Sequence, residues 1–181
     1  MAKFSAFAGL ALLTTSYTVN AAPGEVELAV WANEAIVSTY SYNFNNFMQR
    51  QKEIAKYFTA KGWTDFSTAF IASKLPEAVK ANSYYVSAVA TLPPSIKTVG
   101  PAKWQATMPL LVVYKNPQYQ QKQTVEVTIN FTQVPTDQGV RGLAITSLQS
   151  KIMKPTCKCD LDDENGTTPT NGQEQPQGAA Q

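Results

Sequence analysis

The stretch TVEVTINF, residues Thr124–Phe131, carries the clearest structural signal in this 181-residue chain. Its valines, isoleucine and phenylalanine occupy every second position, and threonine, glutamate and asparagine fill the positions between them. Successive side chains of a strand point to opposite faces, so this alternation predicts a strand with one face buried and the other in water. One-sided burial of this kind is typical of antiparallel sheets.

Similar segments lie on both sides of this strand. The run from Trp104 to Tyr114 places large apolar side chains on one parity, and Gly142–Leu148 supplies another apolar segment. Short polar connections at 116–122 and 135–139 join the three runs, which predicts a meander of two hairpins. Pro109 lacks an N–H and therefore predicts a bulge or an edge position within its strand. An earlier alternating run, 86–92, predicts one more strand before Pro93-Pro94.

The N-terminal half has a helical period instead. Between Glu27 and Ala60 apolar side chains recur at spacings of three, four and seven, and the asparagines between Tyr42 and Phe47 predict either a kink or a break into two helices. Lys61-Gly62 predicts the end of the second helix, and Thr64 predicts the cap of a further helix reaching about Lys74. Pro76 predicts the start of a short last helix. Helices followed by strands indicate an α+β fold.

The two ends of the chain differ from its body. Residues 1–21 have a basic Lys3, an apolar run and a small-x-small site at Val19-Asn20-Ala21, which predicts a cleavable signal peptide and an exported domain over 22–155. The alternative is an uncleaved leader that anchors the domain in the inner membrane. Residues 156–181 hold five carboxylates and almost no large apolar side chain, which predicts a disordered acidic tail.

The cysteines, Cys157 and Cys159, stand at the junction of body and tail. In an exported chain they can form a local or an intermolecular disulfide, or they can lie in a linker without a role. Two thiolates do not complete a tetrahedral zinc site, and the chain has no histidine to add, so we expect no metal and no cofactor.

Catalytic patterns are missing from the sequence. Without histidine there is no Ser-His or Cys-His pair, and the carboxylates of the body fall on polar faces, helix ends and turns. The body from 22 to 154 holds thirteen basic and eight acidic residues without clusters, so we expect no nucleic acid partner. The helical half is rich in aromatic residues, and we expect a curved sheet to cover them; a ligand-stacking groove is the alternative.

Four blocks of sequence resemble the IcmL/DotI family. They are Trp31-Ala32, the segment YSYNFNNF at Tyr40–Phe47, the segment YFTAKGW at Tyr57–Trp63, and the segment KWQATMPL at Lys103–Leu110. The resemblance implies the periplasmic domain of an inner-membrane component of the Dot/Icm type IV secretion system. It also implies helices held in a curved antiparallel sheet, a cone similar to nuclear transport factor two. The motif positions, whose simplest interpretation is structural, are Trp31, Tyr57, Phe58, Thr59, Gly62, Trp63, Trp104 and Pro109.

The function that this resemblance implies is non-enzymatic. We expect an exported, periplasmic assembly or accessory subunit that forms homo- or hetero-oligomers with secretion-system subunits, including IcmL/DotI-like paralogues. Membrane association would come only through partners or an uncleaved leader. The alternative is a periplasmic or secreted small-ligand-binding protein or enzyme on the same cone, because a fold alone does not determine function.

Overall fold

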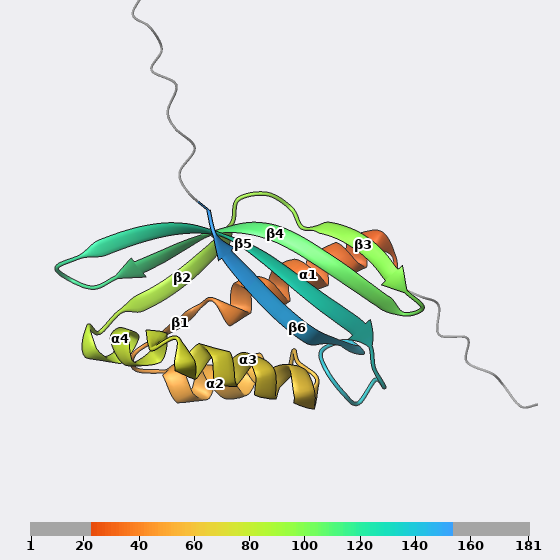
Figure 1. The fold of residues 1–181 in the computed structure, drawn as a ribbon, viewed down its shortest axis with the longest axis horizontal. Coiled ribbons are helices and arrows are strands. Elements are labelled where there is room, and N and C mark those ends of the chain that lie inside the picture. The colour runs from red at the N-terminus through yellow and green to blue at the C-terminus, as the bar shows by residue number, and fades with distance from the viewer. Residues whose placement is uncertain (1–22, 154–181) are drawn as a thin grey trace, which may run out of the picture.

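The computed structural model describes residues 23–153, which form four helices and one antiparallel sheet of six strands. The sheet has the order β1-β2-β4-β5-β6, and β3 pairs with β4 beyond the end of β2. Figure 1 shows the sheet arching over α1, with α2, α3 and α4 along its open side. The helices are α1 (Glu25–Thr39), α2 (Phe47–Ala55), α3 (Ala60–Ala72) and α4 (Leu75–Ala81). The strands are β1 (Tyr42–Asn43), β2 (Tyr85–Ala90), β3 (Ser95–Gly100), β4 (Lys103–Lys115), β5 (Gln120–Gln133) and β6 (Leu143–Ile152).

The predicted break between the first two helices is confirmed. Asn43 accepts hydrogen bonds at its side-chain oxygen from the backbone N–H groups of Asn45 and Asn46, and the Asn46 side chain accepts one from the N–H of Asn43. These amides satisfy backbone donors that a continuous helix would have used internally, so the chain leaves α1 and starts α2 in a new direction.

The predicted boundary between the second and third helices is wrong. Lys61 and Gly62 do not end a helix; they lie in the first turn of α3, and Thr59 rather than Thr64 is its cap. The Thr59 side chain accepts a hydrogen bond from the N–H of Gly62 at 3.1 Å, as a helix cap requires. Gly62 does not end a helix; its lack of a side chain allows α3 to approach the sheet closely.

The meander of β4, β5 and β6 is confirmed. β4 and β5 pair over thirteen positions without a register shift, and the connection between them is only four residues long. In both strands the side chains alternate between buried and half-buried. The buried set of β5 is the one that the sequence indicated: Val125, Val127, Ile129 and Phe131.

Pro109 lies in a central strand, and the β4–β5 ladder has no bulge there. On the other side of β4, β2 pairs with residues 110–115 and β3 with residues 103–107. The carbonyl of Pro109 accepts a hydrogen bond from Thr91, just after β2 ends. The missing N–H of Pro109 therefore lies at the point where the neighbour of β4 changes from β3 to β2. The predicted bulge is wrong. The predicted edge position is correct only for this one point of the strand, which has neighbours on both sides elsewhere.

The core lies between the sheet and α1. Its largest fully buried side chains come from α1, α2 and the inner faces of β4, β5 and β6, and they include two aromatic rings. They are Trp31, Phe131, Ile36, Ile54, Met108, Leu110, Ile129 and Ile145. The α+β class with helices held in a curved antiparallel sheet, expected from the sequence, is confirmed.

Both terminal predictions concern residues outside the described range: the signal peptide over 1–21 and the acidic tail over 156–181 with Cys157 and Cys159. Among residues 23–153, no helix has the length and apolar character needed to cross a bilayer.

Candidate functional site: the contact between α3 and β6

The residues Tyr57–Thr59, which precede α3, pair with the backbone of β6. The N–H of Thr59 donates to the carbonyl of Ile145 at 2.9 Å, and the N–H of Ile145 donates to the carbonyl of Tyr57 at 2.7 Å. Phe58 thereby forms a parallel bridge with Ile145. We call this contact between Tyr57–Thr59 and Ile145 the α3–β6 seam.

Gly62 allows α3 to approach the sheet closely at the seam. A Cβ atom built on Gly62 would lie 2.5 Å from the carbonyl oxygen of Ile145 and 3.1 Å from that of Thr146. Both obstacles are backbone atoms, so they cannot move aside as a flexible side chain could. A side chain at this position would therefore push α3 away from β6.

The aromatic motif residues extend the seam along α3. Phe58 contacts Trp63 and Phe66, with ring centroids 5.7 Å and 5.1 Å apart. Phe66 stacks on Phe70 at 5.6 Å, and Phe70 in turn contacts Tyr42. Aromatic pairs at these separations add to the free energy gained from burial alone.

Trp31 and Trp104 meet through a third ring. Trp31 stacks on Phe131 at 5.0 Å, and Trp104 stacks on the same ring at 5.6 Å. The indole N–H of Trp31 donates to the carbonyl of Val140 at 2.8 Å, which ties α1 to the loop between β5 and β6. Pro109 takes no part in either group, since it lies opposite Glu126 along the sheet.

The carboxylate of Glu34 links α1 to the seam and to the β5–β6 loop through hydrogen bonds. Glu34 on α1 accepts a hydrogen bond from the Tyr57 hydroxyl at 2.5 Å and one from Arg141 at 2.7 Å. The Tyr57 hydroxyl and, next, the Arg141 guanidinium lower the pKa of Glu34, whereas burial is the largest cause that raises the pKa of Tyr57. The sequence did not reveal this cluster, because its members are separated by 23 and 107 positions.

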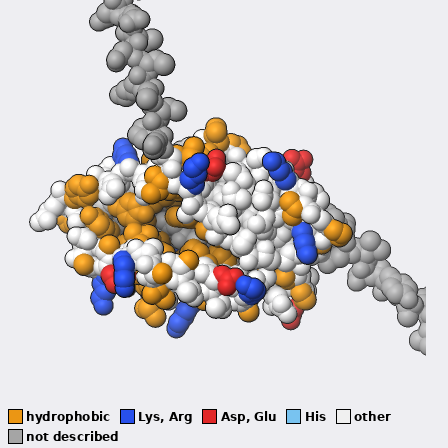
Figure 2. Space-filling view, viewed as in Figure 1, with side chains coloured by type: hydrophobic (Ala, Val, Ile, Leu, Met, Phe, Trp, Pro, Cys, Tyr) orange, Lys and Arg blue, Asp and Glu red, His pale blue; other side chains and the backbone are white. Residues whose placement is uncertain are grey.

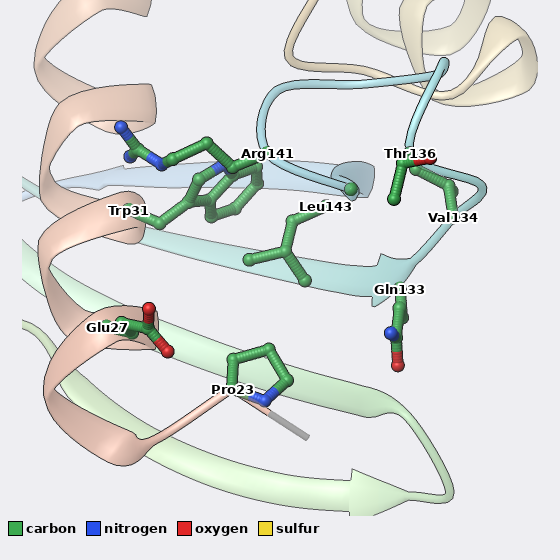
Figure 3. A pocket seen from close by; sticks show the side chains of 9 residues that line it. Pro23, Glu27, Trp31, Gln133, Val134, Thr136, Arg141 and Leu143 are labelled. Carbon is green, nitrogen blue, oxygen red and sulfur yellow. The ribbon is translucent and has the colours of Figure 1, made fainter. Parts of the chain in front are cut away.

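A small pocket lies beside this cluster, between the start of α1 and the β5–β6 loop. It has a volume of about 210 Å³, and Trp31, Arg141 and Leu143 line it together with Glu27 and Pro23. Figure 3 shows Glu27 and Trp31 on α1, Pro23 just before this helix, and Arg141 and Leu143 where the β5–β6 loop leads into β6. Its one carboxylate and one guanidinium do not make the pair of carboxylates that acid–base hydrolysis of glycosides needs.

A larger groove opens where α3 and β6 separate beyond the seam. It has a volume of about 550 Å³, and Figure 2 shows hydrophobic side chains around a hollow in this region. We call this cavity the α3–β6 groove. The residues that define its walls are Tyr40, Tyr42, Phe66, Phe70, Tyr114, Leu148, Ser150 and Ile152.

The titratable groups of the groove are mainly tyrosines. Burial raises the pKa values of Tyr40, Tyr42 and Tyr114 above their ordinary value, so these hydroxyls stay neutral near pH 7. Asp65 is the carboxylate in the wall, and it pairs with Lys61 at 2.6 Å on the exposed side of α3. Among residues 23–153, no group of three potential metal ligands lies together.

Comparisons with known proteins agree with this arrangement. A family model described as "Type-IV b secretion system, inner-membrane complex component", for DotI and IcmL, matches residues 14–152. An IcmL-like type IV secretion system protein from Legionella pneumophila is 56% identical, with 77% of this chain and 100% of that chain covered and a TM-score of 0.73. The comparison with curated proteins gave no match.

Two further solved structures share the architecture. The periplasmic domain of DotI is 32% identical, with 73% of this chain and 98% of that chain covered and a TM-score of 0.68. CagV from Helicobacter pylori, a VirB8 homolog, is 12% identical over 72% of this chain and 100% of that chain, with a TM-score of 0.58, and therefore shows the fold alone. The nuclear transport factor two-like cone is thus confirmed, and this chain belongs to the IcmL/DotI family of type IV secretion system components.

Proposed function

We propose that this chain is a non-catalytic subunit of a type IV secretion system that acts in the periplasm through protein–protein contacts. The family match supports a role in such a system. The observation that carries the non-catalytic part is the filling of the cone. Trp31, Phe131, Met108 and Ile129 occupy its interior at 1% exposure or less, where enzymes and ligand binders of similar shape would need a pocket.

The direction of the pKa shifts supports the same proposal. A catalytic acid on this fold would need a carboxyl group whose pKa is raised by burial. The hydrogen bonds of Glu34 to Tyr57 and Arg141 instead lower its pKa. This behaviour is that of a structural anion, which counts against the alternative of an enzyme.

The motif residues have a structural part in this proposal. Tyr57, Phe58, Thr59, Gly62 and Trp63 would hold α3 on β6, and Trp31 and Trp104 would hold α1 under the sheet. Partner contacts would then use the outer surface, where side chains such as Val26, Val30, Val89 and Leu92 are exposed. Pro109 would have a structural role within the sheet and would not contact a partner.

The proposal includes the domain boundaries and the compartment. Residues 1–21 would direct export and then be removed, and 22–155 would form the periplasmic domain. The family model begins at residue 14, inside the proposed leader. An uncleaved leader would instead hold the domain at the inner membrane, facing the periplasm.

Crosslinking in the native host tests the function. Cells would be treated with a short crosslinker and fractionated, and the chain's mature N-terminus and crosslinked peptides would be identified by mass spectrometry. We expect a periplasmic chain beginning at Ala22, crosslinked to secretion-system subunits. A monomer with no such partner in secreting cells would contradict the proposal, and a chain that keeps Met1 in the membrane fraction would contradict only the proposed cleavage.

A matched pair of variants makes the test specific. Val30→Asp places a charge on the exposed apolar face of α1, where Val30 is 59% exposed, and should reduce crosslinking if that face meets a partner. Lys52→Asp on α2 is the control, since it also introduces a carboxylate on a helix. Equal crosslinking of both variants and the native chain would place the contacts on another surface.

A further inference from the structure

Three tyrosines come together in the wall of the α3–β6 groove. Tyr42 on β1 and Tyr114 on β4 both pair with Val86 of β2, one from each side. Paired residues of neighbouring strands lie on the same face of a sheet, and Val86 is buried, so both tyrosines extend from the inner face. Tyr40, the residue that ends α1, lines the same cavity.

The hydroxyl of Tyr42 has no hydrogen-bond partner among residues 23–153, although the side chain is only 5% exposed. Its ring is held by edge-on contacts with Phe47 and Phe70. Within the same part of the chain, every fully buried side-chain oxygen has a partner, so this hydroxyl must reach open space. The cavity that Tyr42 lines is the α3–β6 groove. A buried tyrosine whose hydroxyl faces a cavity without a partner calls for an explanation.

The tyrosine hydroxyls are close to one another and uncharged. Burial is the largest cause that raises the pKa of Tyr42, and repulsion from the Tyr114 and Tyr40 hydroxyls adds to it. A neutral phenol donates one hydrogen bond. The groove therefore offers hydrogen-bond donors that carry no charge near pH 7.

Apolar side chains form the rest of the groove. Phe66 and Phe70 on α3 stack with their rings 5.6 Å apart and their planes within 12° of parallel, and Leu148 and Ile152 face them from β6. A cavity of about 550 Å³ with mostly apolar walls and a few polar groups has the size and the character of a small-molecule site.

The charges around the groove limit what it can bind. Of the described residues that line it, Asp65 alone is charged, and Asp65 is already paired with Lys61 at 2.6 Å. An anion would lose its water without meeting a lysine or an arginine in the wall, and a cation would have to compete with Lys61. Burial of a charge without a partner is costly, so the groove favours an uncharged ligand.

We propose that the α3–β6 groove binds a small uncharged molecule with a flat apolar body and one hydrogen-bond-accepting oxygen. The body would stack on Phe66 and Phe70, and the oxygen would accept a hydrogen bond from the Tyr42 hydroxyl. This site goes beyond the proposed function and does not rest on it. The side chains that fill the cone, such as Trp31 and Phe131, do not line the groove, so binding leaves the core unchanged.

The fluorescent ketone prodan, an uncharged naphthalene with one carbonyl oxygen, is a suitable probe for the full chain. Its emission shifts to the blue when it leaves water, and titration should show saturable binding. Tyr42→Phe keeps the ring and removes the donor, so it should weaken binding about fivefold, the equivalent of one hydrogen bond. Equal binding by the native chain and this variant, or no binding to the native chain, would overturn the proposal.

The matched control is Tyr85→Phe. Tyr85 also lies on a strand, but it is 50% exposed and does not line the groove. Its variant should bind prodan as the native chain does. An equal loss of binding in Tyr42→Phe and Tyr85→Phe would place the probe on a general apolar surface and overturn the proposal.

The stability of Tyr42→Phe separates a ligand-binding hydroxyl from a structural one. Because the hydroxyl has no partner among the described residues, its removal should leave the urea midpoint of unfolding unchanged or raise it. A lower midpoint would show that the hydroxyl forms a hydrogen bond inside the folded chain, which would overturn the proposal.

Competition with prodan tests the chemistry of the ligand. Acetylnaphthalene should bind the native chain about fivefold more tightly than ethylnaphthalene, which lacks the oxygen, and both should bind Tyr42→Phe equally. Naphthoate, which is charged, should bind at least about tenfold more weakly than acetylnaphthalene. Tighter binding of naphthoate would assign the groove to an anion. Prodan affinity that falls as the protein concentration rises would assign it to a second copy, and either result would overturn the proposal.

Discussion

The α3–β6 contact differs sharply between its two halves. At the seam, the backbone groups of Tyr57 and Thr59 are paired with Ile145, and Gly62 brings the helix against the sheet. Further along, the same helix and strand separate around a groove of about 550 Å³. The same helix and strand are thus closely packed at the seam and separated at the groove. The motif residues Phe58, Thr59 and Gly62 all contribute to the seam. Substitutions in the two halves should therefore have very different effects on stability.

The largest loss of stability should follow Trp31→Ala in the core beside the seam. Trp31 is 1% exposed, stacks on Phe131 and donates to Val140, so its removal leaves a cavity and takes away one of the two hydrogen bonds that the Val140 carbonyl accepts. We expect a loss of about 3–5 kcal/mol in the free energy of unfolding, measured by urea denaturation. Trp31→Phe should lose less. A loss below about 1 kcal/mol for the alanine variant would mean that the core collapses around the cavity.

The next largest effect should come from Gly62→Ala. The new methyl group would meet the Ile145 carbonyl at 2.5 Å, and the strain should cost about 1–3 kcal/mol despite the better helix propensity of alanine. Gly100→Ala is the control, because its nearest neighbours would lie at an ordinary 3.9 Å. Urea denaturation of both variants makes the comparison, and a Gly62→Ala variant as stable as the control would show that the seam can widen freely.

A smaller effect is expected from Thr59→Ala, which removes the cap of α3. The Thr59 hydroxyl accepts a hydrogen bond from Gly62, and the loss of this bond should lower thermal stability by about 1 kcal/mol. Thr59→Ser keeps the acceptor and should recover most of the difference. If Thr59→Ser loses as much stability as Thr59→Ala, the packing of the threonine methyl group, and not the capping hydrogen bond, would be the interaction that stabilises the seam.

Glu34→Gln should have a modest effect that depends on pH. The folded protein lowers the pKa of Glu34 from its ordinary 4.5, so the stabilisation by the carboxylate is fully present above that value and is lost as pH falls through the folded pKa. The native chain should be more stable than the variant at pH 7, by well under 1 kcal/mol given the exposure of the pair. The difference should vanish on acidification, and a constant difference between pH 3 and pH 7 would contradict this account.

The smallest effect on stability should come from the groove. Ile152→Ser removes an apolar side chain that is 65% exposed, and the free energy of unfolding should change by only about 0.5 kcal/mol or less. Thermal unfolding of the full chain measures this. A loss above about 2 kcal/mol would mean that the groove half is as tightly packed as the seam half, which would remove the contrast between them.

The sequence predicted what is local in this fold. The strands β4 and β5 are joined by four residues, and their alternating side chains alone indicated which face is buried. The break near Asn43 was also predictable, because those amides bond to backbone groups two and three positions away.

What depends on distant contacts was missed. The start of α3 was misplaced because Gly62 looked like a helix end, whereas the carbonyl of Ile145 is the reason for a glycine there. The strand β3 was missed because only Ile96 and Gly100 are even half-buried, which leaves no apolar alternation. The cluster of Glu34 with Tyr57 and Arg141 could not be found without the fold, because its members come from α1, the seam and the β5–β6 loop.

The seam also has a consequence for biosynthesis. The N-terminal helices are synthesised first, but Ile145, to which Thr59 is hydrogen-bonded, lies 86 positions further along the chain. Until β6 has been made, the rings of Phe58 and Phe66 lack the strand against which α3 and the residues before it pack. A nascent chain stopped before Ile145 would therefore expose an aromatic surface, so chaperones and proteases would act on truncated copies and not on finished ones.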